Sequence, residues 1–233
     1  MFPRRYITYV EATRHPWPNF IFLLPIVILY EVAVWYCSTH QVDGVRNGAD
    51  GWLRQNLAVY GVNLIWLPPV FLLCFYAFQS FLRWWSRPHE NIETITGMIL
   101  ESGIFGMVLW LVAGIWSKGF LASGVDASSG VSSAWVTYLG AGIYEEAIFR
   151  LLGIHLLLLL FPRNIYPSLP LAFFVSSIGF AISHHLGVFG EAFQFDIFVF
   201  RALAGLYFCA VYMFRGFGIA VGAHVIYDFI VSI

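Results

Sequence analysis

The chain has 233 residues, of which 60% are hydrophobic and only 11% are charged, and its formal net charge is −1. Charged residues make up about 25% of ordinary soluble domains, so this composition excludes a typical soluble protein. The nearly neutral charge and the lack of a basic run also argue against a nucleic-acid partner.

Apolar stretches long enough for membrane helices follow one another along the whole chain, since a helical span needs about 20 largely apolar residues. The first exceeds the apolar core of a signal peptide and lacks a small-residue cleavage site, so we expect it to be retained as a span. The sequence therefore predicts an all-α polytopic membrane bundle of about seven transmembrane helices, in one domain over residues 1–233. The predicted spans are Trp17–Cys37, Leu57–Phe81, Thr94–Trp116, Ala134–Phe161, Ser168–Leu186, Ile197–Phe214 and Phe217–Ile233.

Basic residues are distributed unevenly between the predicted connections. Cationic loops are retained on the cytoplasmic side, so this bias indicates the orientation of the chain. With the N-terminus inside, the inner side carries Arg4, Arg5, Arg14, Arg83, Arg87, Arg163 and Arg215. The outer side then carries only Arg46, Arg54 and Lys118, which predicts a cytoplasmic N-terminus.

Three motifs with ionisable side chains interrupt the later spans. An ionisable group at bilayer depth costs about 2.5–3.5 kcal/mol on insertion scales, so such groups usually face a protein interior or a wet cavity. We therefore expect the motifs to meet in one intramembrane site between the fourth, fifth and seventh predicted helices. They are Glu145-Glu146-x-x-x-Arg150, Phe180-x-x-x-His184 and His224-x-x-x-Asp228.

Helical spacing distinguishes the two adjacent acids. Residues four apart share a helix face, so Glu146 is expected to pair with Arg150 and to have a structural role. Glu145 points elsewhere, and a partly desolvated carboxylate that has no cation beside it is suited to act as a general base. The second histidine and Asp228 are also four apart, so the acid is expected to orient the His224 ring.

These groups are sufficient for amide hydrolysis by an activated water molecule. One acid and one histidine can activate the water, and a second histidine with Asp228 can donate hydrogen bonds to a developing oxyanion. No serine or cysteine nucleophile is needed. We expect neither a metal nor another cofactor.

The ordered trio of motifs on separate spans resembles the CAAX protease and bacteriocin-processing (CPBP) family of glutamic-type intramembrane endopeptidases. The resemblance covers a core of about residues 134–233. It implies that Glu145 and His184 activate the water and that His224 and Asp228 stabilise the oxyanion. It also implies that Glu146, Arg150 and Phe180 support the site.

The third motif ends in Asp228, which is not a purely neutral hydrogen-bond donor. The family accepts Asn or Asp there, and an ionised Asp228 would repel an oxyanion. This residue is therefore expected either to be protonated or to act by orienting His224.

Other functions are compatible with the same residues. Glu145, His184 and His224 are acceptable zinc ligands, although the chain lacks the His-Glu-x-x-His motif of common zinc proteases. Buried ionisable groups are also typical of transporters and proton relays. A catalytically silent relative that confers immunity is a further alternative.

The expected substrate is a membrane-anchored protein or peptide, and the lipid bilayer is the other expected partner. A prenylated CAAX tail is the substrate of the best-known branch of the family. The predicted topology instead puts the site between the middle and the outer side of the membrane, which favours a membrane-tethered tail or the leader of an exported protein. The compact chain resembles prokaryotic members, so the inner membrane of a prokaryotic cell is the expected location.

Ionisable residues outside the motifs have simpler expected roles. Glu31, Glu101 and Arg201 lie in apolar stretches, where pairing between helices is the default. His155 and His185 are expected to take no part in catalysis. Gly140 and Gly142 are expected to permit close helix contacts.

Overall fold

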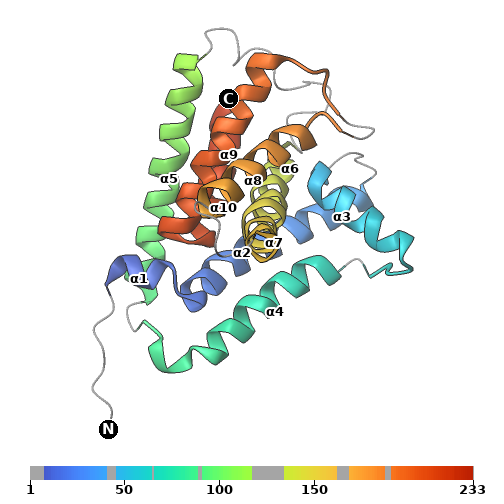
Figure 1. Cartoon of the computed structure of the whole chain (residues 1–233). Coiled ribbons are helices and arrows are strands. Elements are labelled where there is room, and N and C mark those ends of the chain that lie inside the picture. Colours follow the sequence, from blue (N-terminus) through green and yellow to red (C-terminus); the bar gives the residue numbers. More distant parts are fainter. Residues whose placement is uncertain are drawn as a thin grey trace.

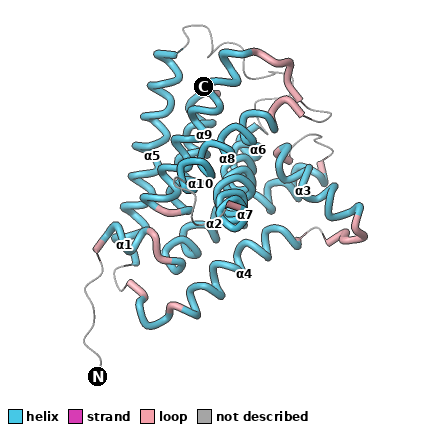
Figure 2. The backbone as a smooth tube through the Cα atoms, viewed as in Figure 1, coloured by secondary structure: helices cyan, strands magenta, loops and turns pink. Residues whose placement is uncertain are grey.

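A computed structural model describes residues 8–40, 46–64, 66–88, 91–116, 134–161, 168–186 and 190–232 of the chain. Every regular element in these ranges is helical, and Figure 2 shows that loops are confined to short connections between the helices. The prediction of an all-α fold is therefore confirmed.

The described helices fall into two groups along the chain, one up to residue 116 and one from residue 134 onward. The first group comprises α1 (Tyr9–Thr13), α2 (Pro16–Thr39), α3 (Gly48–Val59), α4 (Leu67–Leu82), the 3₁₀ turn η1 (Trp84–Ser86) and α5 (Asn91–Trp116). The second group comprises α6 (Ala134–Gly140), η3 (Ala141–Glu145), η4 (Ala147–Gly153), α7 (Ile154–Leu160), α8 (Ser168–Ser183), α9 (Phe195–Arg215) and α10 (Phe217–Val231).

Several of these helices have the length and composition of membrane spans. Among the described residues, α2, α5 and α9 are long and apolar enough to cross a bilayer, and α4, α8 and α10 are shorter apolar helices. Elements α6, η3, η4 and α7 form one further helical run from Ala134 to Leu160. Large apolar side chains such as Trp35, Leu111 and Leu159 face outward, as expected of a surface in contact with lipid. The chain is a helical membrane protein, and the number of seven spans stays a prediction.

The predicted span Leu57–Phe81 is wrong at its N-terminal end. Its first residues belong to α3, which ends at Val59, and α4 begins only at Leu67. Gly61, with φ +78°, adopts the left-handed conformation that commonly follows the end of a helix. The prolines of the first turn of α4 suit the start of a new helix. The other predicted spans coincide with described helices to within a few residues.

Helix α10 lies at the centre of the packing. It contacts α5, α9, η3 and α2, and its residues from Phe217 to Val225 are all buried. In Figure 1, α5 forms one side of the bundle and α4 lies beneath α2, which it contacts. The largest apolar core cluster joins α2, α4, η3 and α10 through residues such as Tyr30, Tyr76, Ile143 and Val221. The helix of the third motif is thus held on several sides.

An asparagine clamp ties the start of α2 to the start of α10. The Asn19 side-chain amide donates to the Thr13 carbonyl oxygen over 2.8 Å, and its oxygen accepts a 2.6 Å hydrogen bond from the Gly218 N–H. Gly216, with φ +102°, forms the turn between α9 and α10. A Cβ at Gly216 would lie 2.6 Å from the Thr13 oxygen, so only glycine suits both this backbone conformation and this close approach.

Candidate active site

The first motif lies on the helical run from Ala134 to Leu160. The middle of that run, η3 and η4, has the wide turns of a π-helix, which are rare and often mark functional sites. Gly142 lets this run approach α10 closely, because a Cβ there would lie 2.9 Å from the Val221 carbonyl oxygen. The two acids therefore lie against the helix that carries His224.

Glu146 lies at the buried bottom of the site. Its Oε1 atom lies 3.0 Å from an Arg150 guanidinium nitrogen and accepts a 2.7 Å hydrogen bond from His224 Nδ1. The side chains of Glu146 and Arg150 are completely buried, and that of His224 is 5% exposed. The expected ion pair is present, and the same carboxylate also fixes the orientation of the His224 ring.

Aromatic rings pack against Arg150 and the two histidines of the site. The Arg150 guanidinium lies 4.4 Å from the centre of the Phe180 ring, and this ring also contacts His184 edge-on at 4.9 Å between centroids. Phe208 of α9 stacks on His224 with a centroid distance of 4.6 Å and an interplanar angle of 12°. Phe180 thus contacts both the arginine and the first histidine, which gives a physical account of its place in the motif.

Glu145 lies between the two histidines of the site. Its Oε2 atom is 3.7 Å from His224 Nε2 and 4.0 Å from His184 Nε2. The side chains of Glu145 and His184 are 12% and 22% exposed, whereas Glu146 is fully buried. The two adjacent acids therefore have different surroundings, one dry and paired and the other within reach of water.

Asp228 approaches the same histidine from α10. Its Oδ2 atom is 3.7 Å from His224 Nε2, which is too long for a hydrogen bond, and its side chain is 21% exposed. Asp228 was predicted to orient the His224 ring, but in the structure the acid that is hydrogen-bonded to this ring is Glu146. The carboxylates of Asp228 and Glu145 instead each lie 3.7 Å from the same nitrogen, His224 Nε2.

Asn47 also contacts Glu145, although it was not among the predicted site residues. The Asn47 side-chain amide donates a 3.1 Å hydrogen bond to Glu145 Oε1, and the residue is 7% exposed. It precedes α3, in a segment interpreted from the sequence as a polar connection. An asparagine at a helix start is so common that no sequence signal singles it out.

Of the three remaining ionisable residues of the apolar stretches, Glu31 and Glu101 pair between helices as expected, whereas Arg201 of α9 pairs with a residue of the connection before its own helix. Glu31 accepts from Arg54 at 2.8 Å, Glu101 pairs with Arg215 at 2.8 Å, and Arg201 binds Glu191 at 2.8 and 2.9 Å. The rings of His185 and His155 hydrogen-bond to the carbonyl oxygens of Glu191 and Leu151. None of these contacts joins the cluster around Glu145.

The geometry brings three carboxylates and two imidazoles of the three motifs to one place, which is the pattern expected from the resemblance to the CPBP family. Residues 127–230 match the family of type II CAAX prenyl endopeptidase Rce1-like proteins. This Rce1-like segment contains every residue of the three motifs, so the resemblance is confirmed. Asn47 lies outside it. No curated protein and no solved structure matches the chain.

Glu145, His184 and His224 were also predicted to be acceptable zinc ligands. Within the described ranges, no group of three or more His, Cys, Asp or Glu side chains is arranged to hold a metal ion. Metal-independent and metal-dependent hydrolysis predict different activities in the presence of a chelator.

Proposed function

We propose that this protein is a glutamic-type intramembrane endopeptidase, which hydrolyses a peptide bond of a membrane-tethered substrate. The observation that carries the proposal is the position of Glu145 Oε2, within 4.0 Å of Nε2 of both His184 and His224. The match to an endopeptidase family over residues 127–230 supports the same class of reaction.

In the proposed reaction, Glu145 and His184 activate a water molecule. His184 Nδ1 lies 2.9 Å from the Phe180 carbonyl oxygen, which can only accept, so Nδ1 carries the hydrogen. In the neutral ring, Nε2 then offers a lone pair toward Glu145. Their 4.0 Å separation is too long for a hydrogen bond and suits one bridging water. This water loses a proton to Glu145 as its oxygen attacks the peptide carbonyl carbon.

The carbonyl oxygen then becomes an oxyanion, which His224 and a protonated Asp228 stabilise in this proposal. Because His224 Nδ1 donates to Glu146, a second donation from Nε2 requires the protonated ring. When the tetrahedral intermediate collapses, the C–N bond breaks and the proton held by Glu145 passes to the leaving amine. The products are a carboxylic acid and an amine, and no acyl group is left on the protein.

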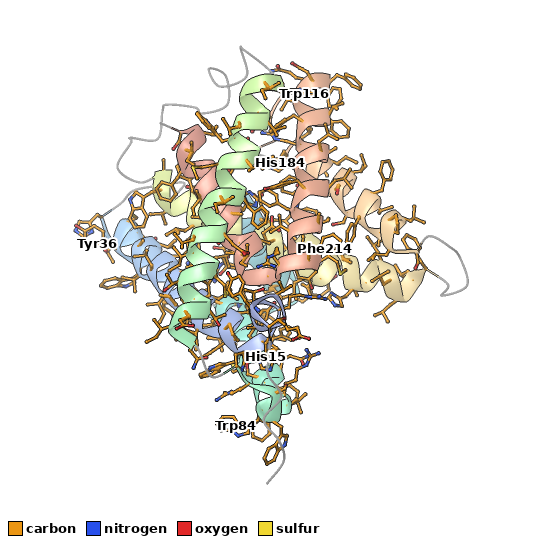
Figure 3. All side chains as sticks on the ribbon, turned by 90° about the vertical axis from the view of Figure 1, so that its left-hand side faces the viewer. His15, Tyr36, Trp84, Trp116, His184 and Phe214 are labelled. Atoms are coloured by element: carbon orange, nitrogen blue, oxygen red, sulfur yellow. The ribbon has the colours of Figure 1, made fainter. Side chains whose placement is uncertain are left out.

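We also propose that the site opens toward the outer half of a prokaryotic inner membrane, with the N-terminus in the cytoplasm. Arg87 stacks on Trp17 and Trp84 near His15, at the end of the bundle opposite Trp116. Figure 3 shows His184 in the half nearer Trp116. A site there would favour a membrane-tethered tail or the leader peptide of an exported protein.

The sidedness can be tested by labelling. In a variant without native cysteines, Gln194→Cys should react with an impermeant thiol reagent added outside intact cells. Reaction only after the cytoplasmic face is opened would reverse the proposed orientation.

Comparative proteomics of peptide termini tests the proposed reaction itself. Cells with the wild-type protein should contain new termini that are missing from cells with Glu145→Ala or His184→Ala. His185→Ala is the matched control and should produce the wild-type termini. Identical termini in the wild type and in Glu145→Ala would contradict the proposal and favour transport or immunity.

A further inference from the structure

Asn47 reaches Glu145 from a segment 98 residues earlier in the chain. Its amide nitrogen donates to Glu145 Oε1 over 3.1 Å, while Glu145 Oε2 faces His184 and His224. One oxygen of the carboxylate is thus held by an amide, and the other is directed toward the two imidazoles. A hydrogen bond of this kind restricts the rotation of the carboxylate.

The orientation of the Asn47 amide is itself fixed. Asn47 is the N-cap of α3, and its side-chain oxygen accepts a 2.7 Å hydrogen bond from the Ala49 N–H. With the oxygen used in the cap, the NH₂ group must point the other way, toward Glu145. The cap thus determines which end of the amide meets the carboxylate.

A buried ionic network holds α3 in place. Asp50, which is completely buried, accepts 2.6 Å hydrogen bonds from Arg46 and Arg54 and a 2.8 Å hydrogen bond from the Tyr30 hydroxyl. The Tyr144 hydroxyl, on the residue before Glu145, donates to Glu31 at 2.9 Å. Because Arg54 also binds Glu31, the network joins α2, α3 and the helical run that carries Glu145.

The close approach of Asn47 depends on a glycine. A Cβ at Gly140 would lie 2.9 Å from the Asn47 Cβ and 2.6 Å from the Tyr30 ring. Gly140 therefore lets the start of α3 lie against the helical run one turn before Glu145.

From these contacts we infer that Asn47 is a positioning residue, which holds the Glu145 carboxylate in the orientation needed to activate water. The inference rests on the proposed function. It adds a functional contribution from α3, which lies outside the segment matched by the endopeptidase family. Asn47 acts through Glu145 and does not itself touch the reacting atoms.

Two substitutions separate this role from helix capping. Serine and aspartate cap helices about as well as asparagine, so both Asn47→Ser and Asn47→Asp keep the cap of α3, and Asn47→Ser should also keep the melting temperature in detergent. Serine cannot supply the amide donor, and aspartate adds a second carboxylate beside Glu145. A hydrogen bond to a charged group contributes enough that its loss should lower kcat roughly 10–100-fold, with KM nearly unchanged.

The predicted order of kcat is wild type, then Asn47→Ser, then Asn47→Asp. A purely structural cap predicts equal values for all three. Asn56→Ser is the matched control on an exposed position of α3 and should leave kcat and KM unchanged. If both Asn47 variants had the wild-type kcat while Glu145→Gln were inactive, the positioning role of Asn47 would be overturned but the proposed function would stand. An active Glu145→Gln would instead overturn the proposed function.

Discussion

Glu146 and His224 are joined by a 2.7 Å hydrogen bond between helices 78 residues apart in the chain. The same Glu146 oxygen lies 3.0 Å from Arg150, so one carboxylate compensates the arginine and orients the histidine. Its neighbour Glu145 is bound by an amide, and its second oxygen faces the two imidazoles. Two adjacent acids of the same type are thus expected to respond differently to substitution.

Replacing each acid by glutamine should separate stability from activity. Glu146→Gln leaves Arg150 buried without a counter-ion, and the loss of one partner of a buried pair costs about 3–5 kcal/mol. Its melting temperature in detergent should fall markedly. Glu145→Gln should melt close to the wild-type temperature and have no activity. Equal melting temperatures for the two variants would contradict the assignment of the structural role to Glu146.

Substitution of Asp228 tests whether hydrogen-bond geometry matters more than charge at this position. Asp228→Asn keeps a side chain of the same shape that can donate to an oxyanion, so it should retain substantial activity. Asp228→Ala should lose most activity, by about 100-fold or more if a donor to the oxyanion is removed. Measurement of kcat for both variants tests this expectation. An equal loss of activity in both would refute the idea that hydrogen-bond geometry is what matters at Asp228.

Gly142→Ala should destabilise the protein. Its Cβ would lie 2.9 Å from the Val221 oxygen, and such overpacking typically costs about 1–3 kcal/mol. Gly103→Ala on α5 is the control, because a Cβ there meets nothing within 4 Å. Removing a glycine from a helix interior should leave stability unchanged or raise it by about 0.5–1 kcal/mol. Thermal unfolding of both variants in detergent provides the comparison.

Activity should persist in a strong chelator. In the proposed reaction, Glu145 and His184 activate the water without a metal ion. We expect the same rate of cleavage before and after prolonged treatment with a chelator, and no stoichiometric metal by elemental analysis. Loss of activity that returns on addition of zinc would favour the metal-dependent alternative.

The sequence predicted the helical membrane fold and the motifs that converge, because both depend on strong local signals. Apolar length marks a span, and an ionisable side chain within it needs a polar partner or a cavity. The i,i+4 pair of Glu146 and Arg150 follows from helical geometry alone. The assignment of catalytic roles to Glu145, His184, His224 and Asp228 stays a prediction.

Contacts between distant segments could not be predicted in the same way. The second partner of Glu146 lies on α10, and the amide bound to Glu145 comes from α3, so neither follows from spacing along one helix. Phe208 looks like any other apolar residue of α9, although it stacks on His224. The break near Gly61 was missed because the residues on both sides are apolar, and mean hydropathy does not report backbone conformation.

The asparagine clamp between Thr13, Asn19 and Gly218 has a consequence for dissecting the protein. A truncated form that starts at the helical run with Glu145 would keep every motif residue but lose the tether on α10, together with the amide donor of Asn47. We expect this fragment to be inactive even if it inserts into a bilayer. We therefore expect that the segment with the three motifs cannot be transplanted as a module by itself.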